Sequence, residues 1–183
     1  ASSPWDSQST WWIGYYSDGK LSFAPAVRTG IPTNLFSNSV LSLNKWYHLA
    51  FVRYNNKLLI FINGVLDKTH TLDYPIINST NDLYIGVHGS TLNVYFNGYL
   101  DNIKIIKGKA IYTDNFYISV PHHTYKVDNY IFNGSTDYLV IPENIAPQLA
   151  GLDFTIEFWA KINFDGFSET DAFILYQGYD DTA

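Results

Sequence analysis

Residues 46–71 constrain the fold of this chain more than any other stretch. They read WYHLAFVRYNNKLLIFINGVLDKTHT, with apolar and aromatic runs separated by two short polar breaks. Asn63-Gly64 is the strongest short-range hairpin signal, because a type I′ turn needs positive φ at both central residues. Asn55-Asn56 predicts a second turn. The stretch therefore predicts an antiparallel meander, rather than a helix, with strands at residues 46–54, 57–62 and 65–71.

Further short strands are expected along most of the chain, and no segment shows a convincing amphipathic helix pattern. Aromatic residues make up 17% of the chain and Glu and Lys are few, a composition that suits strands and turns. Residues 29–43 are expected to be mostly loop, and Asn133-Gly134 predicts a hairpin across residues 130–141. The other expected strands span residues 11–16, 21–27, 83–87, 92–96, 99–106, 154–162 and 173–177. This pattern predicts an all-β fold, an antiparallel two-sheet sandwich.

Length and charge narrow the possible functions. The 183 residues suffice for one sizeable core and are short for two. A net charge of −6 argues against binding to nucleic acid or to an anionic membrane. No apolar run approaches 18 residues, so membrane insertion is not expected, and no signal peptide is expected within these residues. Cysteine is absent, so the chain has no disulfide to stabilise it.

The strand expected at residues 99–106 carries one carboxylate in an unusual place. With a period of two, Tyr99, Asp101, Ile103 and Ile105 share a face, and the two isoleucines mark that face as the better candidate for the core. A buried carboxylate needs a cation, a basic side chain or several N–H donors. Asp101 is therefore a hydrogen-bonded structural residue, a calcium ligand or, least favoured, a catalytic group.

Several segments together resemble the concanavalin A-like lectin/glucanase superfamily, in its laminin-G-like or pentraxin-like branch. They are IGYYSDGKLSF (13–23), WYHLAFVR (46–53), LLIFINGVL (58–66), LYIGVHG (83–89), FNGYLDNIKIIKGKAIYTDNF (96–116) and DFTIEFWAKI (153–162). The resemblance implies a jelly-roll sandwich. It also implies an extracellular, cell-surface or virion-surface protein, because the FNGYLDNIKI ending is frequent in multi-domain adhesins and in virus or phage tail fibres.

The order of these segments departs from the family pattern. Residues 1–118 resemble the middle and closing strands, residues 119–128 form a connector, and residues 129–183 resemble the opening strands. The chain therefore looks like one repeat cut out of phase, or a circular permutant. The opening strands close onto their own chain, which we favour, or onto the next copy head to tail.

The resemblance also implies candidate binding residues. A structural calcium ion in similar sandwiches lies between the opening strand and an aspartate of the closing strand. The matching positions are Asp101, Asn133 and Asp137, although a polar turn without an ion is about equally compatible. Glycan binding would use exposed aromatic rings. From the candidates Trp5, Trp11, Trp12, Tyr15, Tyr16, Tyr95 and Tyr99, the preferred set is Trp5, Trp12, Tyr16 and Tyr95.

Other side-chain expectations follow from the sequence itself. Trp46 and Trp159 are expected in the core because of their apolar neighbours, and at most one of Trp11 and Trp12 can point inward. Asn78 and Asn133 begin N-x-S/T tripeptides, which are weak signals of glycosylation in an Asn-rich chain.

Catalysis is not expected. The three glutamates (Glu143, Glu157 and Glu169) do not fit the E-x-D-x-x-E pattern of the glucanase members, although Glu157 with Asp101 is a conceivable pair. The five histidines lack metal-ligand spacing. The first hypothesis is a non-catalytic recognition module that binds a glycan or glycoprotein surface through loops at one rim. The second is a structural module whose copies link into a fibre without binding sugar, and a glycoside hydrolase is a distant third.

Overall fold

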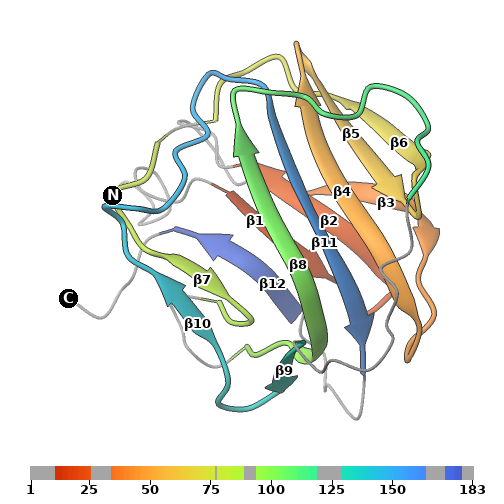
Figure 1. The fold of residues 1–183 in the computed structure, drawn as a ribbon, viewed down its shortest axis with the longest axis vertical. Coiled ribbons are helices and arrows are strands. Elements are labelled where there is room, and N and C mark those ends of the chain that lie inside the picture. The colour runs from red at the N-terminus through yellow and green to blue at the C-terminus, as the bar shows by residue number, and fades with distance from the viewer. Residues whose placement is uncertain are drawn as a thin grey trace, which may run out of the picture.

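The computed structural model describes residues 11–25, 34–76, 78–88, 94–118, 129–163 and 172–178. These residues form two antiparallel six-stranded sheets and contain no helix (Figure 1). Consequently, no helix in this part of the chain could cross a membrane. The first sheet has the order β10-β7-β12-β1-β2-β3, with β1 (Trp11–Tyr15), β2 (Lys20–Pro25), β3 (Leu35–Val40), β7 (Leu83–Ile85), β10 (Leu139–Ile141) and β12 (Ala172–Gln177). The second has the order β6-β5-β4-β11-β8-β9, with β4 (Trp46–Tyr54), β5 (Lys57–Ile62), β6 (Val65–Thr71), β8 (Asn97–Lys107), β9 (Tyr130–Asn133) and β11 (Phe154–Ile162).

The meander β4-β5-β6 confirms the expectation from the two polar breaks. Asn63 and Gly64 have φ values of 52° and 76°, as a type I′ turn requires, and Asn55 has a φ of 55°. The three strands begin and end at the expected residues. The turn residues and the apolar runs therefore predict the same strand boundaries throughout residues 46–71.

The core lies between the two sheets and is rich in aromatic rings. Phe23 of β2 packs against Phe51 of β4 and Phe154 of β11, with ring centroids 6.2 and 5.8 Å apart. Phe158 stacks on Phe51 from the neighbouring strand, and Trp11 is fully buried beside Phe23. Each such side chain stabilises the fold by about 1.5–3 kcal/mol through apolar burial. Trp11 points inward and Trp12 outward, as expected for adjacent residues of a strand.

The sandwich is joined along one side by polar contacts between β3 and β6. The carboxylate of Asp67 accepts the N–H groups of Asn38 (2.6 Å) and Ser39 (3.1 Å), and His70 Nε2 lies 2.8 Å from the carbonyl oxygen of Phe36. On the other side, residues 133–138 carry the chain from β9 in the second sheet to β10 in the first. Two sequence expectations are therefore wrong: residues 130–141 do not form a hairpin, and residues 29–43 include β3.

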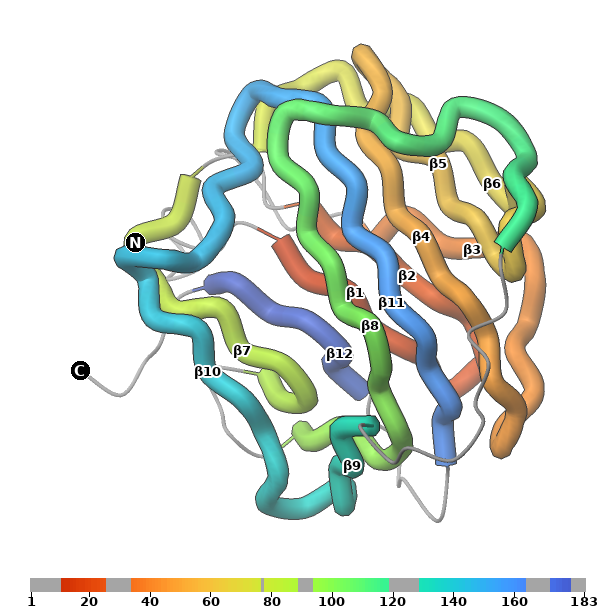
Figure 2. The backbone as a smooth tube through the Cα atoms, viewed as in Figure 1, coloured from red at the N-terminus to blue at the C-terminus, as the bar shows by residue number. Residues whose placement is uncertain are grey.

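The strands of the carboxyl-terminal part pair only with strands that precede them. Among the described residues, β9 pairs with β8, β10 with β7, β11 with β4 and β8, and β12 with β1 and β7. Figure 1 shows β11 (blue) between β4 (orange) and β8 (green), and Figure 2 shows the same arrangement of the backbone. Two central strands of the sandwich thus come from the segment that resembles the family's opening strands.

A bulge in β8 corrects the face expected for Asp101. Trp159 of β11 pairs with Asp101 while Glu157 pairs with Lys104, so β8 contains one extra residue, and Asn102 has a φ of 50°. The bulge changes the phase of the strand. Leu100, fully buried, therefore faces the core together with Ile103 and Ile105, and Asp101 faces outward.

Candidate functional site

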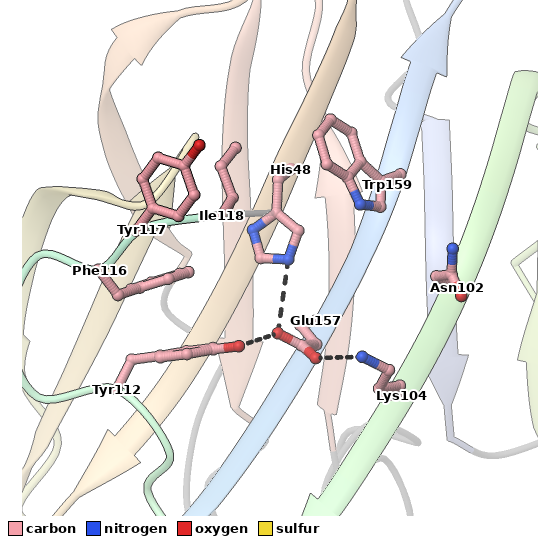
Figure 3. A pocket seen from close by; sticks show the side chains of 9 residues that line it. All are labelled: His48, Asn102, Lys104, Tyr112, Phe116, Tyr117, Ile118, Glu157 and Trp159. Atoms are coloured by element: carbon pink, nitrogen blue, oxygen red, sulfur yellow. Dashed lines mark hydrogen bonds and ion pairs between the residues drawn. The ribbon is translucent and has the colours of Figure 1, made fainter. Parts of the chain in front are cut away.

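A cavity of about 330 Å³ lies on the outer face of the second sheet (Figure 3). Its base is formed by outward-facing residues of β4, β11 and β8. Its other wall is the segment that follows β8 and crosses this face towards β5 and β6 (Figure 1). The lining residues are His48, Asn102, Lys104, Tyr112, Phe116, Tyr117, Ile118, Glu157 and Trp159.

Residues 109–118 are held on the sheet at two places. Near β11, the Thr155 hydroxyl accepts the N–H of Ile111 (2.8 Å) and donates to the carbonyl of Lys109 (3.0 Å). Near the β5–β6 turn, the N–H of Phe116 donates to the carbonyl of Gly64 over 2.8 Å. Gly64 also has no side chain to collide with Phe116, whose carbonyl oxygen occupies the position of a Cβ atom. The Asn63-Gly64 turn therefore both closes a hairpin and positions the cavity wall.

Apolar packing completes this attachment. The side chains of Ala110, Tyr112 and Phe116 pack on a buried cluster of outward-facing residues. That cluster consists of Ala50, Val52, Leu59 and Phe61. The rings of Tyr112 and Phe116 stack with centroids 3.5 Å apart. The wall is thus a packed element with its own small core.

Glu157 is the centre of the polar network at the base. Its Oε1 accepts a hydrogen bond from Lys104 Nζ over 2.9 Å, and its Oε2 accepts one from the Tyr112 hydroxyl over 2.7 Å. His48 Nε2 lies 3.4 Å from the same Oε2. The hydrogen bond with His48 lowers the pKa of Glu157 to about 2, with Tyr112 and Lys104 adding to the effect and burial opposing it. Burial and the bond to Glu157 raise the pKa of Tyr112.

His48 is fixed from several sides. Its backbone N–H donates to Asn63 Oδ1 over 2.9 Å, and its backbone carbonyl accepts the Asn63 N–H over 2.8 Å. The imidazole packs edge-on against Trp159 and Phe116, with centroids 5.4 and 5.8 Å apart. Its Nδ1 is buried and has no hydrogen-bond partner among the described residues. The network therefore holds one ring nitrogen at Glu157 and leaves the other unsatisfied.

Other groups of the cavity are open to a ligand. The Lys104 side chain is 58% exposed, and its ammonium carries three N–H donors, of which Glu157 takes one. Asn102 is exposed, and its amide nitrogen donates to Asp101 Oδ2 over 3.2 Å. Tyr117 is 91% exposed. The cavity thus combines a positioned ammonium, an amide and aromatic rings.

Three of the four aromatic residues expected to bind sugar, Trp12, Tyr16 and Tyr95, lie on or beside the first sheet. Trp12 packs against Phe173 and Tyr176 on the outer face of the first sheet, and Tyr95 belongs to the same cluster. Tyr16 packs against Phe36 of β3, with centroids 5.0 Å apart. Trp5 lies outside the described residues. The structure therefore brings Trp12 and Tyr95 together, and places Tyr16 separately.

Two tryptophans that were expected in the core lie elsewhere. Trp159 is buried, but it faces outward and lines the cavity, because Phe158 and Ala160 take the inward positions of β11. Trp46 is only half-buried, and its ring lies 6.2 Å from that of Tyr99. Neither belongs to the core between the sheets.

The residues expected to bind calcium do not converge. Asp101 accepts the backbone N–H of Asn102 over 2.7 Å. Asn133 pairs with Asn97, four residues from Asp101, which corresponds to about 13 Å along the strand. Asn133 Oδ1 already accepts four hydrogen bonds from Ser135, Thr136 and Asp137, so this turn offers little free oxygen for Ca²⁺. Within the described ranges, no three acidic or imidazole side chains gather as a metal site. Calcium binding stays a prediction. The positions of Asp101, Asn133 and Asp137 do not favour it.

The fold and the sequence define the class of this protein. The family model of the concanavalin A-like lectin/glucanase superfamily matches residues 2–110, and the chain belongs to that superfamily. The resemblance seen in the sequence is thereby confirmed, as is the antiparallel jelly-roll sandwich. No curated protein and no solved structure matches the chain.

Proposed function

We propose that this domain is a non-catalytic carbohydrate-recognition module and that the cavity around Glu157 is its binding site. The observation that supports this most is the combination of Trp159 and Tyr117 with Lys104 and Asn102 in one cavity. A sugar ring has an apolar C–H face that suits aromatic side chains, and hydroxyl groups that suit ammonium donors and amide acceptors. Glu157 would act indirectly, by holding Lys104 in position.

The properties of Glu157 argue against hydrolysis in this cavity. A glycosidase needs two carboxyl groups, one of them with a raised pKa as the acid. Glu157 is the only carboxylate among the nine described residues that line the cavity, and its pKa is lowered to about 2. It therefore stays ionised at neutral pH, and both of its oxygens accept hydrogen bonds. The resemblance of residues 96–105 to the endings of multi-domain adhesins and tail fibres leads us to propose an extracellular, cell-surface or virion-surface location.

The test is a glycan array followed by calorimetry on the best ligand, in calcium and in EDTA. Tyr117→Ala and Lys104→Met should each weaken binding by about tenfold, equivalent to about 1.4 kcal/mol. Tyr54→Ala is the matched control, because Tyr54 is 42% exposed on the same sheet and does not line the cavity. Unchanged affinity in both cavity variants, with melting curves like the wild type, would exclude this site.

Assembly by strand exchange is the second candidate, supported by the pairing of β9 to β12 only with earlier strands. Each of those pairs could equally join two copies. Tyr99 and Ile131 are directly opposite on β8 and β9, and the chain has no cysteine. Oxidation of a Tyr99→Cys/Ile131→Cys variant would give a ladder of linked chains if copies exchange strands. Cross-linked monomers alone, with constant mass in light scattering across a concentration series, would reject assembly.

A further inference from the structure

One edge of β8 is largely unpaired in the described structure. β9 covers only Asn97 to Leu100, and no described strand lies on this edge from Asp101 to Lys107. Lys104 pairs with Glu157 on the opposite edge, where β11 lies. Asn97 shares the outer face with Tyr99 and Asp101, and its carbonyl accepts the N–H of Asn163, which follows β11. Backbone groups of outward-facing β8 residues therefore point to β11, and those of the inward-facing Ile103 and Ile105 point to the open edge.

An apolar groove runs beside this open edge. It has a volume of about 720 Å³ and lies between β8 of the second sheet and β10 of the first. Its lining includes Ile103, Ile105, Leu139, Val140, Ile141 and Ile145. Val140 and Ile145 are 41% and 69% exposed, which is high for side chains of this type. Among the described residues, this side of the sandwich is therefore lined by apolar side chains and has backbone groups of β8 without a neighbouring strand.

These two features together identify the chemistry of an occupant. An apolar small molecule would cover the isoleucines but would leave the backbone N–H and C=O groups without partners. An extended peptide satisfies both, since its backbone pairs with β8 and alternate side chains enter the groove. It would continue the ladder that β9 begins. On the outer face, Lys104 would lie opposite one peptide residue, and an opposite charge there is favourable.

We propose that this groove binds an extended strand of a partner protein, which adds to the edge of β8. The strand has apolar residues opposite Ile103 and Ile105 and an acidic residue opposite Lys104. The proposal does not require carbohydrate binding, although Lys104 takes part in both proposed sites. Asn102 lines both the groove and the cavity, so the two sites adjoin at the bulge of β8.

The test uses the full chain, ¹⁵N-labelled, and the probe acetyl-Thr-Val-Glu-Val-Thr-Val-Glu-amide at up to about 1 mM, a concentration that detects even weak binding. Amide hydrogen exchange and chemical shifts should show protection of the Ile103 and Ile105 N–H groups, whereas Leu100, already next to β9, should change little. A probe with Lys in place of Glu should bind about fivefold more weakly. A probe with N-methylated backbone at alternate residues should lose binding.

Val140→Glu places a carboxylate on the groove wall and should abolish protection. Val65→Glu is the matched control, because Val65 is an exposed valine of β6 outside the groove. No protection by the probe, equal binding of the N-methylated probe, or full binding by Val140→Glu would each overturn the proposal. It would also be overturned if the protein alone dimerised through this groove and excluded the probe, because the occupant would then be a second copy.

Discussion

Glu157 shows how a charged residue can be kept on a strand that is otherwise apolar. It is 5% exposed, and moving a carboxylate out of water is unfavourable by several kcal/mol unless it is paired. Its three partners come from β4, β8 and the segment after β8, so the network links elements that are distant in sequence. Its lowered pKa shows that these contacts favour the ionised form in the folded state.

Replacing this carboxylate should have a pH-dependent effect on stability. The pKa falls from 4.5 to about 2 on folding, so the ionised form stabilises the fold above pH 4.5. This contribution, about 2–3 kcal/mol, is lost as the pH falls from about 4.5 to about 2. Glu157→Gln should therefore be less stable than the wild type at pH 7, and the difference should narrow near pH 2. Urea unfolding at several pH values measures this, with the exposed Glu143→Gln as control. A difference that does not change with pH would contradict it.

The sequence could suggest that some of these side chains face outward, but not which residues come together in this site. Glu157, Trp159 and Lys161 alternate with apolar residues of β11, which indicates an outward face. For Glu157 itself the sequence suggests only a conceivable catalytic pair with Asp101. His48 lies in an apolar run with no pattern that marks it. Tyr112 follows β8 in a segment without periodicity. Their meeting depends on how residues 109–118 cross the sheet, and no local pattern predicts such a path.

At the level of elements, the bulge in β8 decides which side chains reach the cavity. Asn102 adopts a φ of 50°, which asparagine tolerates and β-branched residues do not. Asn102→Val should lower the free energy of unfolding by about 1–3 kcal/mol, whereas Asn102→Gly should change it little. Urea unfolding of both variants compares them directly. If the two variants were equally stable, the positive φ of the bulge would not be a constraint.

Strands with strong local signals were predicted well, and those defined by distant partners were not. Asn63-Gly64 alone predicts a turn, and the alternation of apolar and other residues along 154–162 alone predicts a strand. β3 lacks such a pattern, because its sequence, Leu-Phe-Ser-Asn-Ser-Val, is polar in its second half. It is a strand because it pairs with β2 and because Asp67 of β6 accepts its backbone N–H groups. Likewise, Asn133-Gly134 signals a turn, but the turn changes sheets instead of closing a hairpin.

At the level of the whole molecule, folding should require both parts of the chain. The family match ends at residue 110, yet β11 separates β4 from β8 and β12 separates β1 from β7. A fragment of residues 1–118 would lack both central strands and expose the apolar faces that they cover. We therefore expect this fragment alone to show no cooperative unfolding transition. Mixing it with a fragment of residues 119–183 should restore one, since the strand pairs do not require a covalent connection.

Circular dichroism and tryptophan fluorescence of the two fragments, separately and mixed, provide the measurement. The control is a mixture in which the second fragment carries Phe158→Asp, which places a charge in the core between the sheets and should prevent recovery. A cooperative transition in residues 1–118 alone would mean that the matched region folds without β11 and β12. The carboxyl-terminal strands would then be an addition to a complete domain. Recovery only in the unmodified mixture would show that the sandwich forms from two parts that depend on each other.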